Sequence, residues 1–161
     1  MDNREYEQIV KTHIDTVYRI ALSYTKTSAD ADDVVQQTFL KLLTKMPDFT
    51  DSEHEKRWLI RVCINECHNL FSSFWRKYVE SIEEMTTEPA FTMKESSELY
   101  EAMKQLPAKC RIVIYLFYYE GYASKEIAEI LHIKEATVRT RLVRGRKLLG
   151  TLLKEAWNNE E

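Results

Sequence analysis

Two stretches of the chain repeat basic and amide side chains at the spacing of a single helix face. In the first, steps of three or four residues align five polar side chains: Arg61, Asn65, Asn69, Ser72 and Arg76. Guanidinium and amide groups donate hydrogen bonds to phosphate oxygens and to the edges of bases. This face therefore has the chemistry to bind a nucleic acid, although an ordinary solvent-exposed helix face is the alternative.

The second stretch is strongly basic and lies near the carboxy end. Residues 134–154 hold seven basic side chains and one acidic side chain, a local charge of +6 in a chain whose net charge is −3. Before it, residues 126–131 predict a short helix and residues 132–134 predict a turn, and a longer helix begins at about residue 135. This order is typical of a helix-turn-helix, whose second helix enters the major groove of DNA.

The longer helix has an apolar face and a candidate DNA-binding face. The apolar face consists of Val138, Leu142, Gly145 and Leu149. The opposite face carries the candidate DNA contacts, which are Arg139, Thr140, Val143, Arg144 and Lys147. Arg144 and Lys147 can donate to guanine, and Val143 can contact a thymine methyl group. The flanking arginines, Arg139, Arg141 and Arg146, can reach phosphates.

Length and composition restrict the elements that can position these two faces. The chain has 161 residues, of which 44% are hydrophobic and 30% charged, with three glycines and three prolines. This is enough apolar material for a packed core, and too few turn residues for a β-sandwich or barrel. We therefore expect an all-α fold, with four or more helices before the acidic middle of the chain and three or four after it.

An acidic stretch separates the two candidate faces. Residues 80–101 carry seven acidic side chains and one basic side chain, and their apolar periodicity is weak. Such a segment is typical of a linker between domains. The sequence thus predicts two small helical domains, residues 1–78 and 96–161, joined by an acidic linker at 79–95, with the helix-turn-helix in the second domain.

Apolar periodicity predicts which side chains these helices bury. The first helix should bury a stripe at helical spacing, namely Tyr6, Val10, Ile14, Val17, Ala21 and Tyr24. The second should bury Ala31, Val35, Phe39 and Leu42. A polar loop is expected to about residue 55, followed by a third helix from near Trp58. In the second domain, the aromatic run 115–119 is expected to pack in the core.

Cys63, Cys67 and His68 lie close together on the third helix and raise the question of a metal site. The two cysteines fall on the apolar stripe and His68 turns away from it, so buried thiols are the favoured interpretation and no metal is expected. No His, acid and nucleophile occur at motif spacing, and no glycine-rich phosphate loop is present. We expect a protein that is not an enzyme and has neither a cofactor nor a small-molecule substrate.

Cysteine usage and hydropathy predict a cytoplasmic protein. The three cysteines lack the density of a disulfide-stapled secreted domain. The amino end lacks an apolar stretch, and the longest apolar run, residues 112–119, is far shorter than the roughly 20 residues that cross a bilayer. Neither a secretory signal nor a membrane anchor is expected.

Three motifs resemble a known family in their order and spacing. The segment 30–40, Asp-Ala-Asp-Asp-Val-Val-Gln-Gln-Thr-Phe-Leu, is similar to the second conserved helix of bacterial RNA polymerase sigma factors of the extracytoplasmic-function (ECF) class, within the sigma-70 family. Residues 58–62, Trp-Leu-Ile-Arg-Val, with Asn65, resemble the start of the promoter-reading helix. A third motif resembles the family's carboxy-terminal helix-turn-helix. It consists of Leu106-Pro107, residues 126–131, and residues 137–142 with Arg144 and Arg146.

For the first domain, the resemblance implies docking on core RNA polymerase and recognition of the minus-ten element. The docking residues would be Asp33, Gln36 and Gln37, placed on the clamp helices of the largest polymerase subunit. The promoter-reading residues would be Arg61, Asn65 and Asn69. The loop 47–54, supported by Trp58, would hold a base flipped out of the duplex, and extruding a base costs a few kcal/mol.

For the second domain, the resemblance implies recognition of the minus-thirty-five element. Arg139, Thr140, Val143 and Arg144 would contact this element, and the domain would rest on the flap of the second-largest polymerase subunit. The acidic linker would pass through the polymerase interior. The family also implies a membrane-bound anti-sigma factor, which could hold the protein at the inner face of the membrane.

The chain departs from the family pattern at three places. Ala123 stands where the family usually has a serine helix cap, and His132 stands where it has the glycine of the turn. Histidine tolerates the left-handed conformation better than most residues, so the turn is expected to form. Ser72 and Ser73 stand where arginines are common, which predicts a weaker phosphate contact on that helix.

Two other classes of protein remain alternatives. One is a dimeric helix-turn-helix regulator that binds duplex half-sites and uses its amino-terminal helices as a sensor or interface. The polar face that begins at Arg61 argues against it. The other is a helical interaction module that does not bind DNA, which the +6 segment disfavours.

Overall fold

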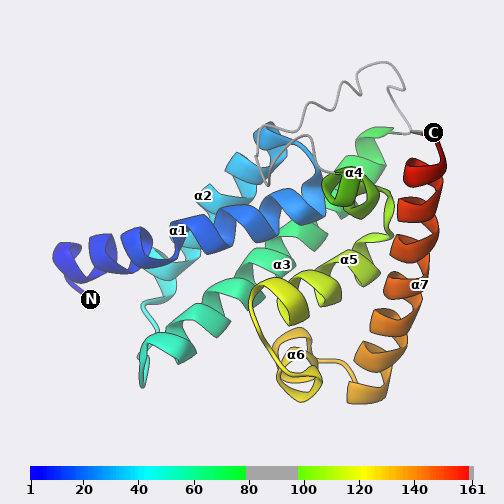
Figure 1. Cartoon of the computed structure of the whole chain (residues 1–161). Helices are drawn as coiled ribbons and strands as arrows, with labels where there is room; N and C mark the ends of the chain where they lie inside the picture. Colours follow the sequence, from blue (N-terminus) through cyan, green and yellow to red (C-terminus); the bar gives the residue numbers. More distant parts are fainter. Residues whose placement is uncertain (79–97, 160–161) are drawn as a thin grey trace. The chain divides into compact units, whose positions relative to one another are not determined.

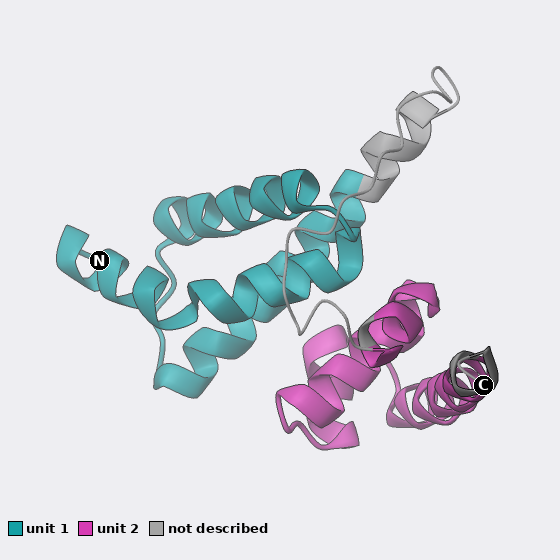
Figure 2. Cartoon of the chain, turned by 45° about the horizontal axis from the view of Figure 1, so that its top comes forward, with its two compact units in different colours: residues 1–90 teal, residues 91–161 magenta. Residues whose placement is uncertain are grey.

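The computed structural model describes residues 1–78 and 98–159, and in these ranges every regular element is a helix (Figure 1). The all-α prediction is therefore confirmed. The chain divides into two compact units, residues 1–90 and 91–161 (Figure 2). The predicted linker at 79–95 lies outside the described residues.

The first unit is a bundle in which each of three helices packs on the other two: α1 (Asn3–Thr25), α2 (Ser28–Lys45) and α3 (Ser52–Tyr78). The described part of this unit therefore has fewer helices than the four or more that we expected. Helix α3 is long, and it starts at Ser52 instead of near Trp58, so it includes residues that were expected to belong to the polar loop. The carboxylate of Asp51 accepts a hydrogen bond from the His54 backbone N–H at 2.7 Å, which caps the helix at this earlier position.

The buried face of α1 differs from the predicted stripe in the first half of the helix, where Tyr6 and Val10 are only half-buried and Ile9 is buried instead. Val17, Ala21 and Tyr24 are buried as predicted, but Ile14 is 39% exposed and the neighbouring His13 is buried in its place. His13 is tolerated there because its Nε2 lies 2.7 Å from the carboxylate of Glu55, at the start of α3. Burying a polar group that has a hydrogen-bond partner costs little free energy, so His13 can lie in the interior although its side chain is polar.

The second unit contains α4 (Glu98–Gln105), α5 (Ala108–Ile114), a π-helix η1 (Tyr115–Tyr119), α6 (Ser124–Leu131) and α7 (Glu135–Asn159). Helices α4, α5 and α6 all pack against α7. Gly145 of α7 faces Ile114 and Cys110 of α5, and a Cβ at this position would clash with Ile114. The glycine therefore allows the close approach of these two helices.

The aromatic run 115–119 forms the π-helix, in which the Glu120 N–H donates to the Tyr115 carbonyl at 3.2 Å. Tyr115 is buried, but Tyr118 is 59% exposed and Tyr119 is also exposed. The expectation that the whole run packs in the core was therefore wrong for these two residues. The wider π turn changes the direction of each side chain relative to an α-helix, and the sequence pattern does not show this change.

Helices α6 and α7 form the predicted helix-turn-helix. His132 ends α6 in the left-handed conformation, with φ 55° and ψ 46°, as its position in the turn requires. Ala123 provides no side-chain acceptor, but its N–H donates to the Glu126 carboxylate at 3.0 Å. The amino end of α6 therefore has one of the two reciprocal hydrogen bonds of a capping box.

Candidate nucleic-acid interface

The outward face of α7 carries all five candidate contacts of the second unit. Each of these side chains is exposed: Arg139, Thr140, Val143, Arg144 and Lys147. Val138 and Leu142, on the opposite side of the helix, are buried against the rest of the unit. The 3.6-residue period of the helix thus separates a packing face from a face that is open to a ligand.

Some side chains on the outward face of α7 already donate hydrogen bonds within the chain, and others do not. Arg139 forms an ion pair with Glu135 at 2.9 Å, and the Thr140 hydroxyl donates to the Ala136 carbonyl at 3.0 Å. Within the described part of the chain, the side chains of Arg144 and Lys147 form no hydrogen bond or ion pair. Arg144 and Lys147 can therefore bind an acceptor without giving up an internal partner.

Three of the candidate contacts in the first unit lie at four-residue steps along α3. Arg61 and Asn65 are half-buried, and Asn69 is exposed. Their face turns away from Leu59, Cys63 and Cys67, which are fully buried. Arg76 belongs to the last turns of α3, and its side chain lies outside the described part of the structure.

An aromatic cluster fixes the loop between α2 and α3. The Phe49 ring makes edge contacts with His54 at 5.4 Å and with Trp58 at 5.8 Å between ring centroids. The Thr50 backbone N–H donates to Nδ1 of His54 at 3.2 Å. The sequence analysis placed Trp58 beside this loop but missed Phe49, which was recognisable as a lone aromatic residue in a polar segment.

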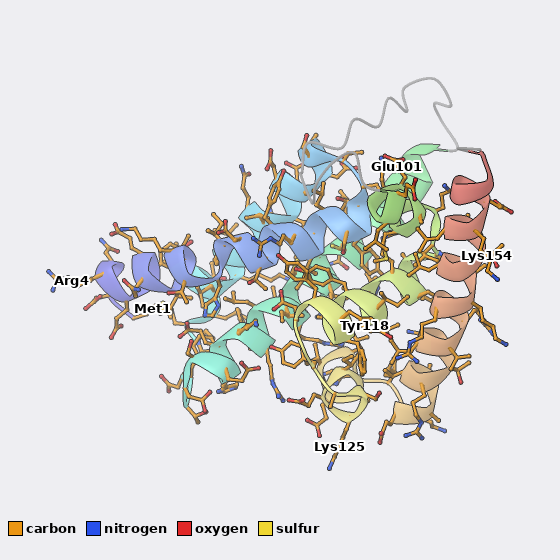
Figure 3. The ribbon with its side chains drawn as sticks, viewed as in Figure 1. Met1, Arg4, Glu101, Tyr118, Lys125 and Lys154 are labelled. Carbon is orange, nitrogen blue, oxygen red and sulfur yellow. The ribbon has the colours of Figure 1, made fainter. Side chains whose placement is uncertain are left out.

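A cavity of about 560 Å³ lies between this loop and the amino-terminal part of α1. The loop contributes Met46, Pro47, Asp48 and Phe49, and α1 contributes polar side chains that include Arg4, Glu5 and Gln8. Figure 3 labels Arg4 at the first turn of α1. The walls thus combine apolar surface with charged and amide groups, a composition suited to a planar polar ligand.

The three predicted polymerase contacts lie on the exposed face of α2. Asp33, Gln36 and Gln37 are all exposed. The same face continues with Leu40 and Leu43, which are 48% and 46% exposed. Sequence reasoning missed these two leucines, although both fall outside the apolar stripe that was predicted to be buried. Together with the three polar side chains, they give this face of α2 a mixed polar and apolar surface.

The cysteines of α3 are buried thiols, as predicted. The contact with the Cys67 thiol, followed by burial, raises the pKa of Cys63 well above its usual value. His68 points elsewhere, and its Nε2 lies 2.6 Å from the Tyr24 hydroxyl. The described residues contain no group of histidine, cysteine and acidic side chains that could hold a metal ion. Among the described helices, none has both the length and the apolar character that crossing a membrane requires.

Comparisons with known proteins place both units in one family. Residues 9–77 match the family Sigma-70 region 2, and residues 96–149 match the family Sigma-70, region 4. The chain is 30% identical to RNA polymerase sigma factor SigV of Bacillus subtilis, over 87% of this chain and 86% of that protein. It is 27% identical to ECF RNA polymerase sigma factor SigM of the same organism, over 96% and 98% of the two chains.

Solved structures have the same fold. The sigma factor RpoE of Bartonella quintana, crystallised with the anti-sigma factor NepR, is similar with a TM-score of 0.80 and 23% identity, over 94% of this chain and 98% of that chain. CnrH, solved with the cytosolic domain of CnrY, is similar with a TM-score of 0.66 and 25% identity, over 96% and 90%. The chain belongs to the sigma-70 family of RNA polymerase sigma factors, in the ECF class, and directs promoter-specific initiation of transcription.

Proposed function

We propose that the two units each recognise one promoter element, the first unit through α3 and the second through α7. The observation that carries this proposal is the pair of donor-bearing helix faces, one in each unit. Arg144 and Lys147 on α7 are exposed and have no side-chain hydrogen bond or ion pair with any residue that the structure describes, which suits readout of the minus-thirty-five element in the major groove. Arg139, Thr140 and Val143 complete this contact face.

The face of α3 would read the minus-ten element. Arg61, Asn65 and Asn69 offer guanidinium and amide groups at one-turn intervals, and Arg76 extends the series toward the end of the helix. The loop 47–54 would hold a flipped base during strand opening. The cavity beside Phe49 and the edge contacts of its ring support this role, since a flipped base needs apolar walls and nearby polar groups.

The face of α2 would bind core RNA polymerase. Asp33, Gln36 and Gln37 would dock on the clamp helices, and Leu40 and Leu43 would add apolar contact area to the same surface. The second unit would rest on the polymerase flap. We place the domain boundaries at 1–78 and 96–161, with the acidic segment 79–95 as the linker between them.

A membrane-bound anti-sigma factor would hold the protein at the inner face of the membrane, in the cytoplasm, until it is released. The binding of an anti-sigma factor is supported by two similar solved structures, RpoE with the anti-sigma factor NepR and CnrH with the cytosolic domain of CnrY, and the tethering at the membrane is part of the proposal alone. The chain would act without a catalytic site, a cofactor or a small-molecule substrate of its own. Its chemistry would consist of binding polymerase, promoter DNA and the inhibitor.

In vitro transcription tests the proposal directly. Purified core polymerase, with and without this chain, is supplied with genomic promoter fragments, and new start sites should occur only when the chain is present. Substituting either promoter element in turn should abolish those starts. An absence of new starts, together with tight binding of the free chain to a palindromic duplex, would favour a dimeric regulator instead.

A further inference from the structure

Arg146 lies on the flank of α7, between its buried face and its outward face. The side chain is exposed, and its guanidinium carbon lies over two aromatic rings, 5.5 Å from the Phe117 centroid and 5.4 Å from the Tyr118 centroid. Its Nε–H also donates a hydrogen bond to the Tyr118 hydroxyl oxygen at 2.6 Å. The orientation of this arginine is therefore fixed before any ligand arrives.

These contacts leave most of the donors unused. A guanidinium has five N–H groups, and the hydrogen bond to Tyr118 uses one of them. In the part of the chain that the structure describes, Arg146 and Tyr118 form no other hydrogen bond or ion pair. Because the Tyr118 oxygen acts as the acceptor, its own hydrogen remains available. Tyr118 is 59% exposed, so both side chains can donate to a ligand from solvent.

The π-helix η1 explains how two consecutive aromatic residues face the same arginine. A π-helix has more residues per turn than an α-helix, so neighbouring side chains diverge by less than the roughly 100° of an α-helix. Here the rings of Phe117 and Tyr118 make an edge contact at 4.9 Å and both lie beneath Arg146. π turns of this kind occur frequently at functional sites. Tyr118, labelled in Figure 3, extends from this turn.

We propose that Tyr118 and Arg146 form a binding site for one backbone phosphate of the duplex that α7 contacts. The proposal rests on the assignment of α7 to the minus-thirty-five element. A phosphodiester presents two anionic oxygens, and a planar guanidinium beside a hydroxyl supplies matching donors. The sequence indicates only that Arg146 can reach a phosphate, and the structure adds Tyr118 as the second donor and as part of the support that orients the guanidinium.

The surroundings favour a phosphate of DNA over an isolated anion. Arg139, Arg144 and Lys147 lie on the adjoining face of the same helix, and together they attract a polyanion that extends along α7. A helix that places its outward side chains in the major groove has the phosphate backbones along its flanks. Arg146 is on such a flank. Since its rotamer is already restricted, binding a phosphate requires little further ordering.

The test measures how tightly the holoenzyme, formed from core polymerase and the full chain, binds a promoter duplex at several salt concentrations. Arg146→Gln should reduce the slope of log affinity against log salt by about 0.9, the value for one phosphate contact. Tyr118→Phe keeps the ring and removes the hydroxyl, so it should weaken binding about three- to tenfold. Tyr119→Phe removes a hydroxyl from the same turn and is the matched control: the ring of Tyr119 stacks on that of Tyr115, outside the proposed phosphate site, and this variant should leave affinity unchanged.

A methylphosphonate scan of the minus-thirty-five backbone identifies the phosphate itself. One neutralised position should weaken binding of the unsubstituted protein and have no further effect on Arg146→Gln. The proposal is overturned if no such position exists, or if Arg146→Gln keeps the full salt slope. It is also overturned if Tyr118→Phe lowers the unfolding temperature but leaves affinity unchanged, because the side chain is then structural.

The same duplexes separate this proposal from the assignment of α7. If the unsubstituted holoenzyme shows no base preference at the minus-thirty-five element, the assignment of α7 fails. If the base preference is present and Arg146→Gln binds with an unaltered salt slope, only the phosphate site fails. Arg146→Lys retains the charge but loses the planar guanidinium and its Nε donor, and should bind with intermediate affinity.

Discussion

Single residues of α3 and α7, the two helices proposed to contact DNA, differ in how much of the fold depends on them. Arg144 is exposed and makes no internal hydrogen bond or ion pair among the described residues, so replacing it removes a ligand contact and little else. Asn65 is half-buried, so part of its surface packs against the first unit. Cys63 is fully buried, its thiol donates a hydrogen bond to the Val17 carbonyl of α1 at 3.5 Å, and its pKa is raised.

Arg144→Ala should weaken holoenzyme binding at the minus-thirty-five element by about 1–3 kcal/mol and relax base preference there, because a donor to a base edge is lost. The measurement is the affinity for promoter duplexes that carry each base at each position of the element. Lys154→Ala, an exposed cation farther along α7 and outside the proposed contact set, is the matched control. An unchanged base preference would remove Arg144 from the reading residues.

Asn65→Ala should impair opening at the minus-ten element while leaving assembly with core polymerase intact. The amide is on the proposed reading face, and α2, not α3, carries the proposed polymerase contacts. Permanganate reactivity of thymines reports opening, and co-migration with core polymerase reports assembly. If assembly is lost instead, Asn65 has a structural role in the bundle.

The stability of the first unit should fall as pH rises above about 8.5, the usual thiol value. The raised pKa of Cys63 means that the folded state holds its proton more tightly than the unfolded state does. The contribution of this proton to the free energy of unfolding is therefore complete below the pKa that Cys63 has in the unfolded chain. It is lost as pH rises toward the pKa of Cys63 in the folded state, by at most about 1.4 kcal/mol per pH unit for one proton. Urea unfolding between pH 7.5 and 9.5 should show a shallower pH slope for Cys63→Ala, and equal slopes would contradict this expectation.

At the scale of elements, the ends of the helices decide where the functional side chains lie. His132 closes α6 in a left-handed conformation and so sets the angle at which α7 leaves the turn. The amino end of α6 is less well satisfied, because Ala123 accepts no hydrogen bond through its side chain. This end of α6 is a site where stability can be gained without touching the outward face of α7.

Ala123→Ser should stabilise the second unit by about 0.5–2 kcal/mol, since the hydroxyl can accept the Glu126 N–H and complete the capping box. Chemical denaturation of the protein, followed by hydrogen exchange of α6 amides, measures the gain. Ala123→Val adds volume without an acceptor and should bring no gain. Equal stability of the serine and valine variants would show that the backbone at this end is already satisfied by other groups.

The helices of both units could be predicted from apolar periodicity and turn residues, because both report local backbone preferences. The buried and exposed faces of α7 could be predicted from the same periodicity: Val138 and Leu142 are buried, and Arg144 is exposed. Features that depend on a distant partner did not follow. His13 is buried because Glu55 approaches it from α3, and Tyr118 is exposed because the backbone widens into a π turn. Neither cause is visible within a single helical repeat.

For the whole molecule, function depends on assembly with polymerase, and the face of α2 is the surface proposed for it. When a partner covers apolar side chains that face solvent in the free chain, their removal from water makes the free energy of binding more favourable. Leu40 and Leu43 are such side chains, and they adjoin Asp33, Gln36 and Gln37. Uneven charge has a related effect, since the local charge of +6 at residues 134–154 would attract DNA although the net charge of the chain is −3.

The double variant Leu40→Gln and Leu43→Gln should bind core polymerase more weakly, by about 1 kcal/mol or roughly fivefold for each side chain. The reason is that polymerase would bury the exposed half of each leucine, and glutamine gains less from that burial. Folding should be unaffected, since neither side chain is part of the core. Competition with a labelled sigma factor for core polymerase measures the affinity. Leu148→Gln, an exposed leucine of the second unit, is the control. Unchanged affinity of the double variant would exclude the two leucines from this interface.

The π turn at residues 115–119 has a consequence for how the length of the chain can vary. Its hydrogen bond from Glu120 to Tyr115 spans one residue more than an α-helical bond does, so the turn contains a single surplus residue. Deleting one residue there would convert the turn into ordinary α-helix while keeping the helix-turn-helix in phase with α5. Such a shortened chain would retain its core and lose the paired rings beneath Arg146. If the proposed phosphate site is correct, deleting one residue at this position would thus lower DNA affinity without requiring a new fold.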